Sequence, residues 1–197
     1  MGETILPLIL FALAGSFSPG PNNIMAAASG AAVGLRRTVP QIAGVTIGFS
    51  VMLVALAFGG GSIFAGYPAL HSWLRIVGAL YLLYLAWRIA GAGNPTVSAR
   101  GHRPLTFLEA ALFQWANPKA WTLALGSIAA FTPVGKPFAF ELAAIICIFA
   151  VMVVASLVTW CLFGVTVSRF LTSPRALRVF NLTMAALVAL SVMLLFL

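Results

Sequence analysis

The chain has 197 residues, of which 62% are hydrophobic and only 7% are charged, and its mean hydropathy is +1.08. Soluble domains carry about a quarter charged residues, so this composition excludes an ordinary soluble protein and indicates an integral membrane protein. The formal net charge of +8 comes from basic residues between apolar runs, which fits the positive-inside rule better than nucleic-acid binding.

Six apolar runs long enough to cross a bilayer as α-helices follow one another along the chain. They are expected at residues 4–29, 39–58, 70–90, 105–130, 138–164 and 176–197. No basic segment precedes the first run, so we expect it to be kept rather than removed as a signal peptide. The predicted fold class is therefore an all-α integral membrane protein with six transmembrane helices in one domain, 1–197.

The first run is interrupted in its middle by a short polar segment. Its sequence there is Ser18, Pro19, Gly20, Pro21, Asn22 and Asn23. A proline inside a helix removes a backbone donor and clashes with the preceding turn, at a cost of about 3 kcal/mol or more. We therefore expect a broken helix, with Ser18 as the N-cap of a new half-helix.

The start of the second helix follows a basic segment. Residues 34–37 are expected to form a short loop, and Thr38 followed by Pro40 is typical of a capped helix start. Within this helix, Gly44 and Gly48 form a GxxxG spacing, which lets a neighbouring helix approach closely.

The fourth helix repeats the pattern of the first. Gln114, Asn117, Pro118 and Lys119 lie in its middle, and Asn117 is the expected N-cap of a second half-helix. Lys119 lies too deep in the helix to reach the interface easily, and an uncompensated lysine there costs at least about 2.5 kcal/mol. This cost favours a functional role for Lys119.

The other chemically active residues give weaker signals. Glu109 is expected to pair with Arg103 or to reach the interface, and its role in proton transfer is left open. Cys147 and Cys161 lie 14 residues apart on one expected helix, about 21 Å, which excludes a disulfide between them. No metal or cofactor site is expected.

The distribution of lysine and arginine predicts the orientation. The segments that follow the first, third and fifth helices, with their flanks, hold eight of these residues, and the opposite side holds two. The first set is therefore expected in the cytoplasm and both termini outside. Because each half has three helices, the halves 1–92 and 103–197 would form an inverted-topology pair, joined by a short cytoplasmic linker.

Paired breaks of this kind predict a binding site at the centre of the membrane. Each half-helix start leaves unpaired N–H groups and a partial positive charge, and with Lys119 these suit a carboxylate. The carbonyl groups before each break are expected to receive an ammonium group, so a zwitterion fits both ends. Proline kinks without a binding role are the alternative. An enzyme is disfavoured because no nucleophile or acid–base cluster is present.

The two motifs together resemble those of the lysine-exporter (LysE/RhtB-type) family. The resemblance rests on residues 18–23, 28–30, 34–38 and 114–121. It implies proton-driven export of small amino acids or their derivatives across the bacterial inner membrane, and the second motif is most similar to that of cysteine and O-acetylserine exporters. The substrate-binding residues expected are Ser18, Pro19, Gly20, Pro21, Asn22, Asn23, Gln114, Asn117, Pro118 and Lys119. A channel, a scaffold subunit, an exporter of another metabolite and a homo-oligomer remain alternatives.

Overall fold

The computed structural model describes residues 2–60, 68–91, 103–132, 138–170 and 173–193. In chain order the elements are α1 (Gly2–Phe17), α2 (Pro21–Ala55), the π-helical turn η1 (Leu56–Gly60), α4 (Pro68–Gly91), α6 (Phe107–Ala116), α7 (Pro118–Phe131), α8 (Ala139–Phe170) and α9 (Pro174–Met193). The described part of the chain contains no strand, and the prediction of an all-α protein is confirmed.

The first break, residues 18–20, lies between α1 and α2 as expected. The predicted cap residue is wrong, because the N-cap is Gly20 in an extended conformation (φ −174°, ψ 172°) and it makes no side-chain cap bond. Pro21 occupies the first helical position, where a missing N–H costs nothing. The Ser18 hydroxyl instead donates to the carbonyl of Gly15 at 3.0 Å, so it closes α1 rather than opening α2.

A bend at Gly34 divides α2 into two straight parts. Gly34 has φ 79° and ψ 172°, a backbone conformation that favours glycine because it has no Cβ. The prediction of a loop at residues 34–37 is wrong for residues 35–37, because the helix continues from residue 35 onward. Thr38 is not a cap either, because its hydroxyl donates to the carbonyl of Gly34 at 2.9 Å from within the first turn.

The second break, at Asn117, agrees with its prediction in detail. Asn117 has an extended backbone (φ −95°, ψ 110°), and its side-chain oxygen accepts from the backbone N–H of Lys119 at 3.1 Å. Pro118 follows at the first position of α7. A capping asparagine and a proline in the first turn therefore end α6 and start α7 within one residue.

The remaining helices lie close to their predicted positions. The helix α8 extends six residues beyond its predicted end at residue 164, and α9 is described only to Met193. Both cysteines are free, as predicted. Among the described residues, the segments Pro21–Gly59 and Ala139–Phe170 are long and apolar enough to cross a membrane, and the breaks divide other apolar runs into shorter helices. The centre of the predicted linker lies outside the described residues.

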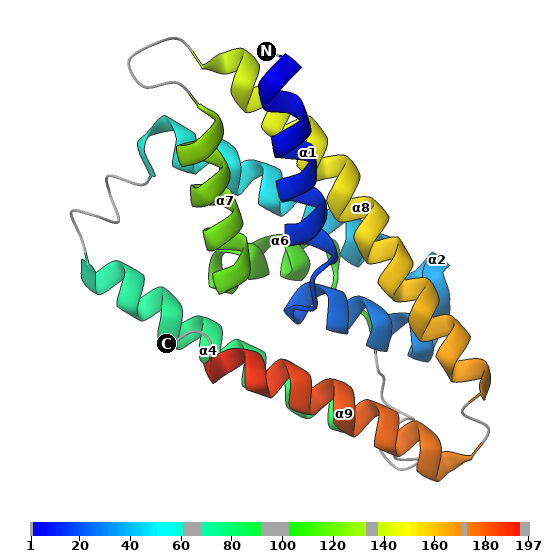
Figure 1. Cartoon of the computed structure of the whole chain (residues 1–197). Coiled ribbons are helices and arrows are strands. Elements are labelled where there is room, and N and C mark those ends of the chain that lie inside the picture. The colour runs from blue at the N-terminus through cyan, green and yellow to red at the C-terminus, as the bar shows by residue number, and fades with distance from the viewer. Residues whose placement is uncertain (1, 61–67, 92–102, 133–137, 171–172, 194–197) are drawn as a thin grey trace.

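The helix α2 lies at the centre of the packing. It contacts α8 and α6 most extensively, while α4 and α9 lie side by side in opposite directions (Figure 1). A Cβ at Gly44 or Gly48 would clash with the backbone of α6 at Phe107 and Ala111. The close approach predicted from the GxxxG spacing is therefore confirmed, with α6 as the neighbour.

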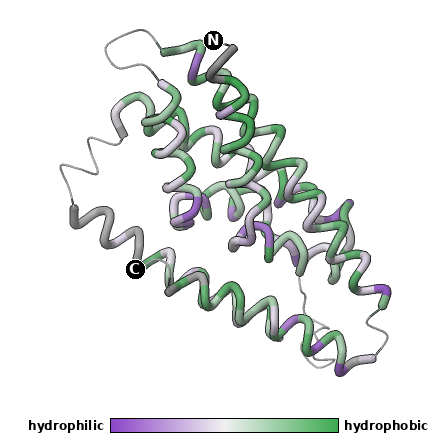
Figure 2. Tube along the Cα trace, viewed as in Figure 1, coloured by the Kyte–Doolittle hydropathy of each residue, from purple (hydrophilic) through white to green (hydrophobic). Residues whose placement is uncertain are grey.

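The outer surface is apolar as well as the core. Large side chains such as Leu80, Leu108 and Val151 are more than 60% exposed, an extent typical of a surface covered by lipid. Figure 2 shows hydrophobic colour along most of each helix and hydrophilic colour in the middle, where α1 gives way to α2 and α6 to α7. Several buried polar residues thus lie at the two breaks, among them Ser16, Asn23, Gln114 and Asn117.

Candidate functional site

A cleft of about 450 Å³, including the space at its mouth, lies between the two breaks. Six of the ten predicted site residues line it: Gly20, Asn22, Asn23, Gln114, Asn117 and Lys119. The other four, Ser18, Pro19, Pro21 and Pro118, shape the breaks and do not line the cleft. Residues almost a hundred positions apart in sequence are therefore brought to one place.

Lys119 joins the two breaks directly. Its ammonium group donates to the backbone carbonyl of Ser18 across the cleft. A Cβ added at Gly20 would stand 2.8 Å from Cδ of Lys119 and 3.1 Å from its Nζ. The missing side chain at Gly20 therefore provides the space that the lysine side chain occupies.

A second contact between the breaks is made by two amides. The side chain of Asn22 donates to Oε1 of Gln114 at 2.9 Å, while Nε2 of Gln114 donates to the carbonyl of Ala110 at 2.7 Å. Gln114 is buried, whereas Asn22 is partly exposed to the cleft. Gln114, which sequence analysis placed beside the second break, is thus held in position by its own helix.

Asn23 holds the first break from inside. Its side-chain nitrogen donates to the carbonyls of Ser16 (2.7 Å) and Ser18 (2.9 Å), and it is buried. These are carbonyls that α1 leaves without helical partners when it ends. Asn23 therefore donates hydrogen bonds to carbonyl groups that have no helical partner because the prolines interrupt the helix.

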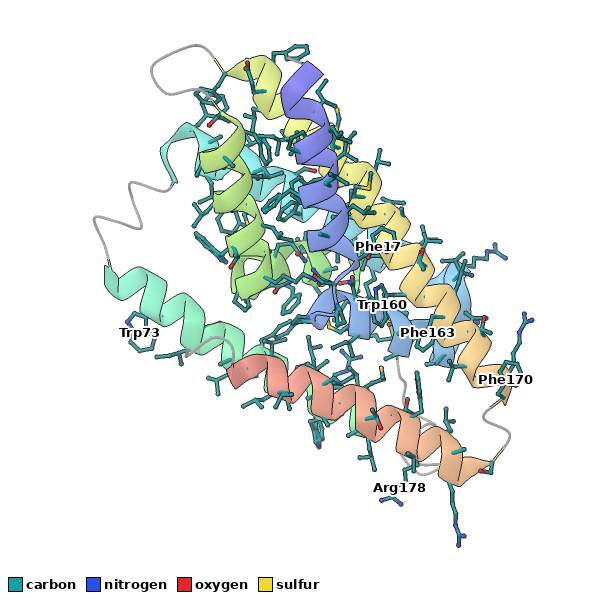
Figure 3. The ribbon with its side chains drawn as sticks, in the orientation of Figure 1. Phe17, Trp73, Trp160, Phe163, Phe170 and Arg178 are labelled. Carbon is teal, nitrogen blue, oxygen red and sulfur yellow. The ribbon has the colours of Figure 1, made fainter. Side chains whose placement is uncertain are left out.

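Two side chains of α8 complete this arrangement. The hydroxyl of Ser156 donates to the carbonyl of Ser16 at 2.8 Å, and Nε1 of Trp160 donates to the carbonyl of Phe17 at 3.3 Å. Figure 3 shows Trp160 beside Phe17, where α8 passes the end of α1. The expectation that the carbonyls before the first break are free for an ammonium group is therefore wrong, because side-chain donors already occupy them.

Two hydroxyl groups in the cleft were not predicted from the sequence. Ser16 and Ser156 both line it, and Oγ of Ser16 is buried without a hydrogen-bond partner among the described residues. The apolar walls come from Val45, Phe49 and Leu157, among others. A single serine in the apolar stretch 142–158 of α8 was the available signal for Ser156.

Glu109 lies away from the cleft, at the start of α6. Its carboxylate forms an ion pair with Arg103 at 2.7 Å, which confirms the predicted pairing. The same carboxylate accepts from the backbone N–H of Thr106 at 2.8 Å, and the Thr106 hydroxyl accepts from the N–H of Glu109, so the two residues form a capping box. These contacts account for Glu109 as a residue that stabilises the helix start.

Comparison with known proteins agrees with the resemblance inferred from the motifs. The family described as LysE type translocator matches residues 13–197. A cysteine/O-acetylserine efflux protein of Salmonella choleraesuis (strain SC-B67) is 32% identical over 121 residues, which are 61% of this chain and 62% of that protein. Proteins with the same name from Klebsiella pneumoniae and Escherichia coli (strain K12) are each 30% identical, over 66% and 55% of this chain and over 67% and 55% of their own lengths.

The similarity to the first of these relatives thus spans a little under two thirds of its length. No solved structure matches the chain. The family match covers nearly the whole sequence, and it includes both breaks and the cleft between them. The chain therefore belongs to the LysE type translocator family, whose members are multi-pass membrane transport proteins of the inner membrane rather than enzymes.

Proposed function

We propose that the protein exports small neutral amino acids or their derivatives, and that the substrate binds as a zwitterion in the cleft between the two breaks. The observation that carries this proposal is the position of Lys119. It is the one cation among the residues that line the cleft, and its ammonium bridges the two breaks. A charge held in this position inside an apolar protein is costly and marks a functional site.

The carboxylate of the substrate would be bound by Lys119 and the start of α7. The ammonium group is held by the carbonyl of Ser18, a neutral acceptor. A carboxylate is a stronger partner, because it adds the attraction between opposite charges to the hydrogen bond, and this attraction is stronger inside a protein than in water. The N-terminus of α7 adds a partial positive charge on the same side.

The ammonium group of the substrate would be bound by neutral oxygens. Oγ of Ser16 has no hydrogen-bond partner in the described part of the chain, and Oδ1 of Asn22 receives a long contact of 3.5 Å from Gln114. Both residues line the cleft. Ser16 and Asn22 would thus bind the ammonium group, a role that the sequence pattern predicted for the backbone carbonyls before each break.

The wall of the cleft selects against a cationic side chain. Among the described residues that line it none is acidic, and apolar residues such as Val45, Phe49 and Leu157 form much of its surface. A second positive charge on the substrate would be desolvated there without a partner, which is strongly unfavourable. The cleft therefore fits cysteine or O-acetylserine, the substrates in the names of the similar proteins, better than it fits lysine.

Transport would follow from an inverted repeat of two halves. Both halves have the same order, a broken helix followed by a long helix and a third helix, and the third helices α4 and α9 pack against each other. Repeats of this kind support alternating access around a central site, with protons as the driving ion. In this scheme Lys119 binds the carboxylate when protonated and releases it when it loses the proton.

Counterflow in proteoliposomes tests the function. Purified protein is reconstituted with unlabelled O-acetylserine inside, and uptake of labelled O-acetylserine or cysteine is measured, with lysine as the comparison substrate. A carrier produces a transient accumulation of label, whereas a channel produces only equilibration. Accumulation with the neutral substrates and not with lysine is expected, and the absence of counterflow with every amino acid tested would refute the proposal.

A further inference from the structure

A second cavity, open on one side, lies beside the first, between α2, α4 and the segment that leads into α6, and it measures about 290 Å³ including the space at its mouth. Its polar lining consists of Ser29, Gln41, Arg88 and Arg103. None of these residues belongs to the cleft between the breaks. The two cavities share the same part of α2, because Met25 lies one turn beyond Asn22 and Gln41 lies one turn before Val45.

The amide of Gln41 carries a donor that is not used. Its Oε1 accepts from the hydroxyl of Ser29 at 2.8 Å, but its Nε2 has no hydrogen-bond partner among the described residues. Gln41 is only 1% exposed, so solvent does not hydrate this group freely. A buried donor left without an acceptor destabilises the folded protein, and this cost is recovered when a ligand supplies the acceptor.

The charges around the cavity favour an anion. Arg103 is balanced by Glu109, with which it forms an ion pair at 2.7 Å. The guanidinium of Arg88 donates to the backbone carbonyl of Arg103 at 3.0 Å and lies 5.8 Å from the centre of the Tyr84 ring, and no carboxylate pairs with it among the described residues. The group of Arg88, Arg103 and Glu109 thus carries one net positive charge next to an unused amide donor.

The position of the cavity matches the side from which an exported substrate arrives. The bend of α2 and the end of α4 lie at one end of the molecule, at the lower right of Figure 1, together with the end of α8 and the start of α9. This end carries the arginines that the positive-inside rule assigns to the cytoplasm. A substrate that passes this cavity would next meet Asn22 in the cleft.

We propose that this second cavity is a carboxylate-binding site, in which Gln41 and Arg88 receive the carboxylate of the substrate on the cytoplasmic side before it moves to Lys119. The route of the substrate rests on the proposed function, whereas the binding of a carboxylate at Gln41 and Arg88 does not. A planar carboxylate offers two oxygens, one for the guanidinium and one for the amide, and arginine suits such paired contacts better than lysine does.

The test separates this site from the one at Lys119. Thermal unfolding of the purified protein is followed in detergent with the variant Lys119→Met as background, so that the cleft no longer offers its cation. Sodium propionate is the probe, with sodium chloride as the control for ionic strength and propylammonium chloride as the control for the apolar chain. A ligand that binds only the folded state raises the unfolding temperature.

In the Lys119→Met background, propionate should raise the unfolding temperature beyond both controls. Adding Gln41→Leu or Arg88→Gln should weaken the apparent affinity about tenfold, as expected for the loss of one hydrogen bond to a charged group. Arg37→Gln removes the same charge from an exposed position and should leave the affinity unchanged. Each variant is compared with its own unfolding temperature without ligand, so a change in baseline stability does not affect the result.

Two outcomes would overturn the proposal. One is that propionate has no effect beyond the controls in the Lys119→Met background, whatever the transport activity of the unmodified protein. The other is that Arg37→Gln weakens binding as much as Arg88→Gln does, which would mean a general effect of surface charge. If counterflow fails with every amino acid while propionate binding behaves as expected, the proposed function is refuted and the carboxylate site stands.

Discussion

The ammonium group of Lys119 donates a hydrogen bond to the backbone carbonyl of Ser18, a residue 101 positions earlier in the chain. This contact joins the start of α7 to the end of α1 and crosses the cleft between the two breaks. The donor is a full charge and the acceptor is a carbonyl released by a broken helix. A carboxylate can therefore replace this carbonyl as the partner of the lysine. The Ser18 carbonyl would still accept from Asn23, so it would not be left unpaired.

The two neighbouring asparagines of the first break should differ in their roles. Asn23→Ala removes the donor to the carbonyls of Ser16 and Ser18, and at about 0.5–1.5 kcal/mol for each bond it should lower stability by about 1–3 kcal/mol. Asn22→Ala, at a partly exposed position, is the matched comparison, because it removes one hydrogen bond, to Gln114, and should lower stability less than Asn23→Ala does. Thermal unfolding of the two purified variants measures the difference, and equal unfolding temperatures would contradict the role given to Asn23.

The contact between Asn22 and Gln114 should appear as coupling in transport. Asn22→Ala and Gln114→Met each break the bond of 2.9 Å, so the double variant should lose less activity than the two single losses added together. A coupling of about 0.5–1.5 kcal/mol is expected from one hydrogen bond. Initial rates of counterflow in the four proteins give this value, and strictly additive losses would show that the amide pair does not act as a unit.

The close packing of α2 on α6 should be sensitive to a single methyl group. A Cβ at Gly48 would stand 2.5 Å from Cα and 2.6 Å from the carbonyl oxygen of Ala111, both backbone atoms that cannot turn aside. Gly48→Ala should therefore destabilise the protein by about 1–3 kcal/mol. Gly126→Ala is the control, because its Cβ would meet only the tip of the Phe11 ring at 3.3 Å. A Gly48→Ala protein as stable as the control would contradict this packing.

The orientation can be tested at two exposed helix starts. In a variant without Cys147 and Cys161, a cysteine is introduced by Ser173→Cys, before α9, or by Ala139→Cys, at the start of α8. An impermeant thiol reagent applied to intact cells should label the second and not the first. The opposite pattern would place the arginine-rich end outside, and the second cavity would then face the wrong side for an exported substrate.

The sequence predicted the breaks better than the details around them. Proline disfavours a helical conformation of the residue before it through local contacts alone, so the ends of α1 and α6 could be predicted from Pro19 and Pro118. The cap at Asn117 was predicted for the same reason, since its partner is only two residues away. Ser18 was assigned wrongly because two prolines flank Gly20, and the local pattern does not decide which residue becomes extended.

Contacts between distant residues could not be predicted from the pattern. Nothing in the local sequence shows that Ser156 and Trp160 of α8 occupy the carbonyls at the end of α1. The cavity at Gln41 was missed for a similar reason, because its polar lining comes from three segments that are brought together only by the fold. Periodicity identifies the helices, whereas these sites depend on how the helices pack.

The most direct test of the central claim is counterflow by Lys119→Met in proteoliposomes, measured beside the unmodified protein. Methionine keeps most of the length of the side chain and removes the charge, so folding should be preserved and transport of O-acetylserine or cysteine should be lost. Lys119→Arg keeps the charge but not the ability to give up a proton, and should bind substrate while transporting it slowly. We expect no accumulation above protein-free liposomes for Lys119→Met at an unchanged level of folded protein. Counterflow at the unmodified rate and with the unmodified pH dependence would show that the lysine between the two breaks does not bind the substrate.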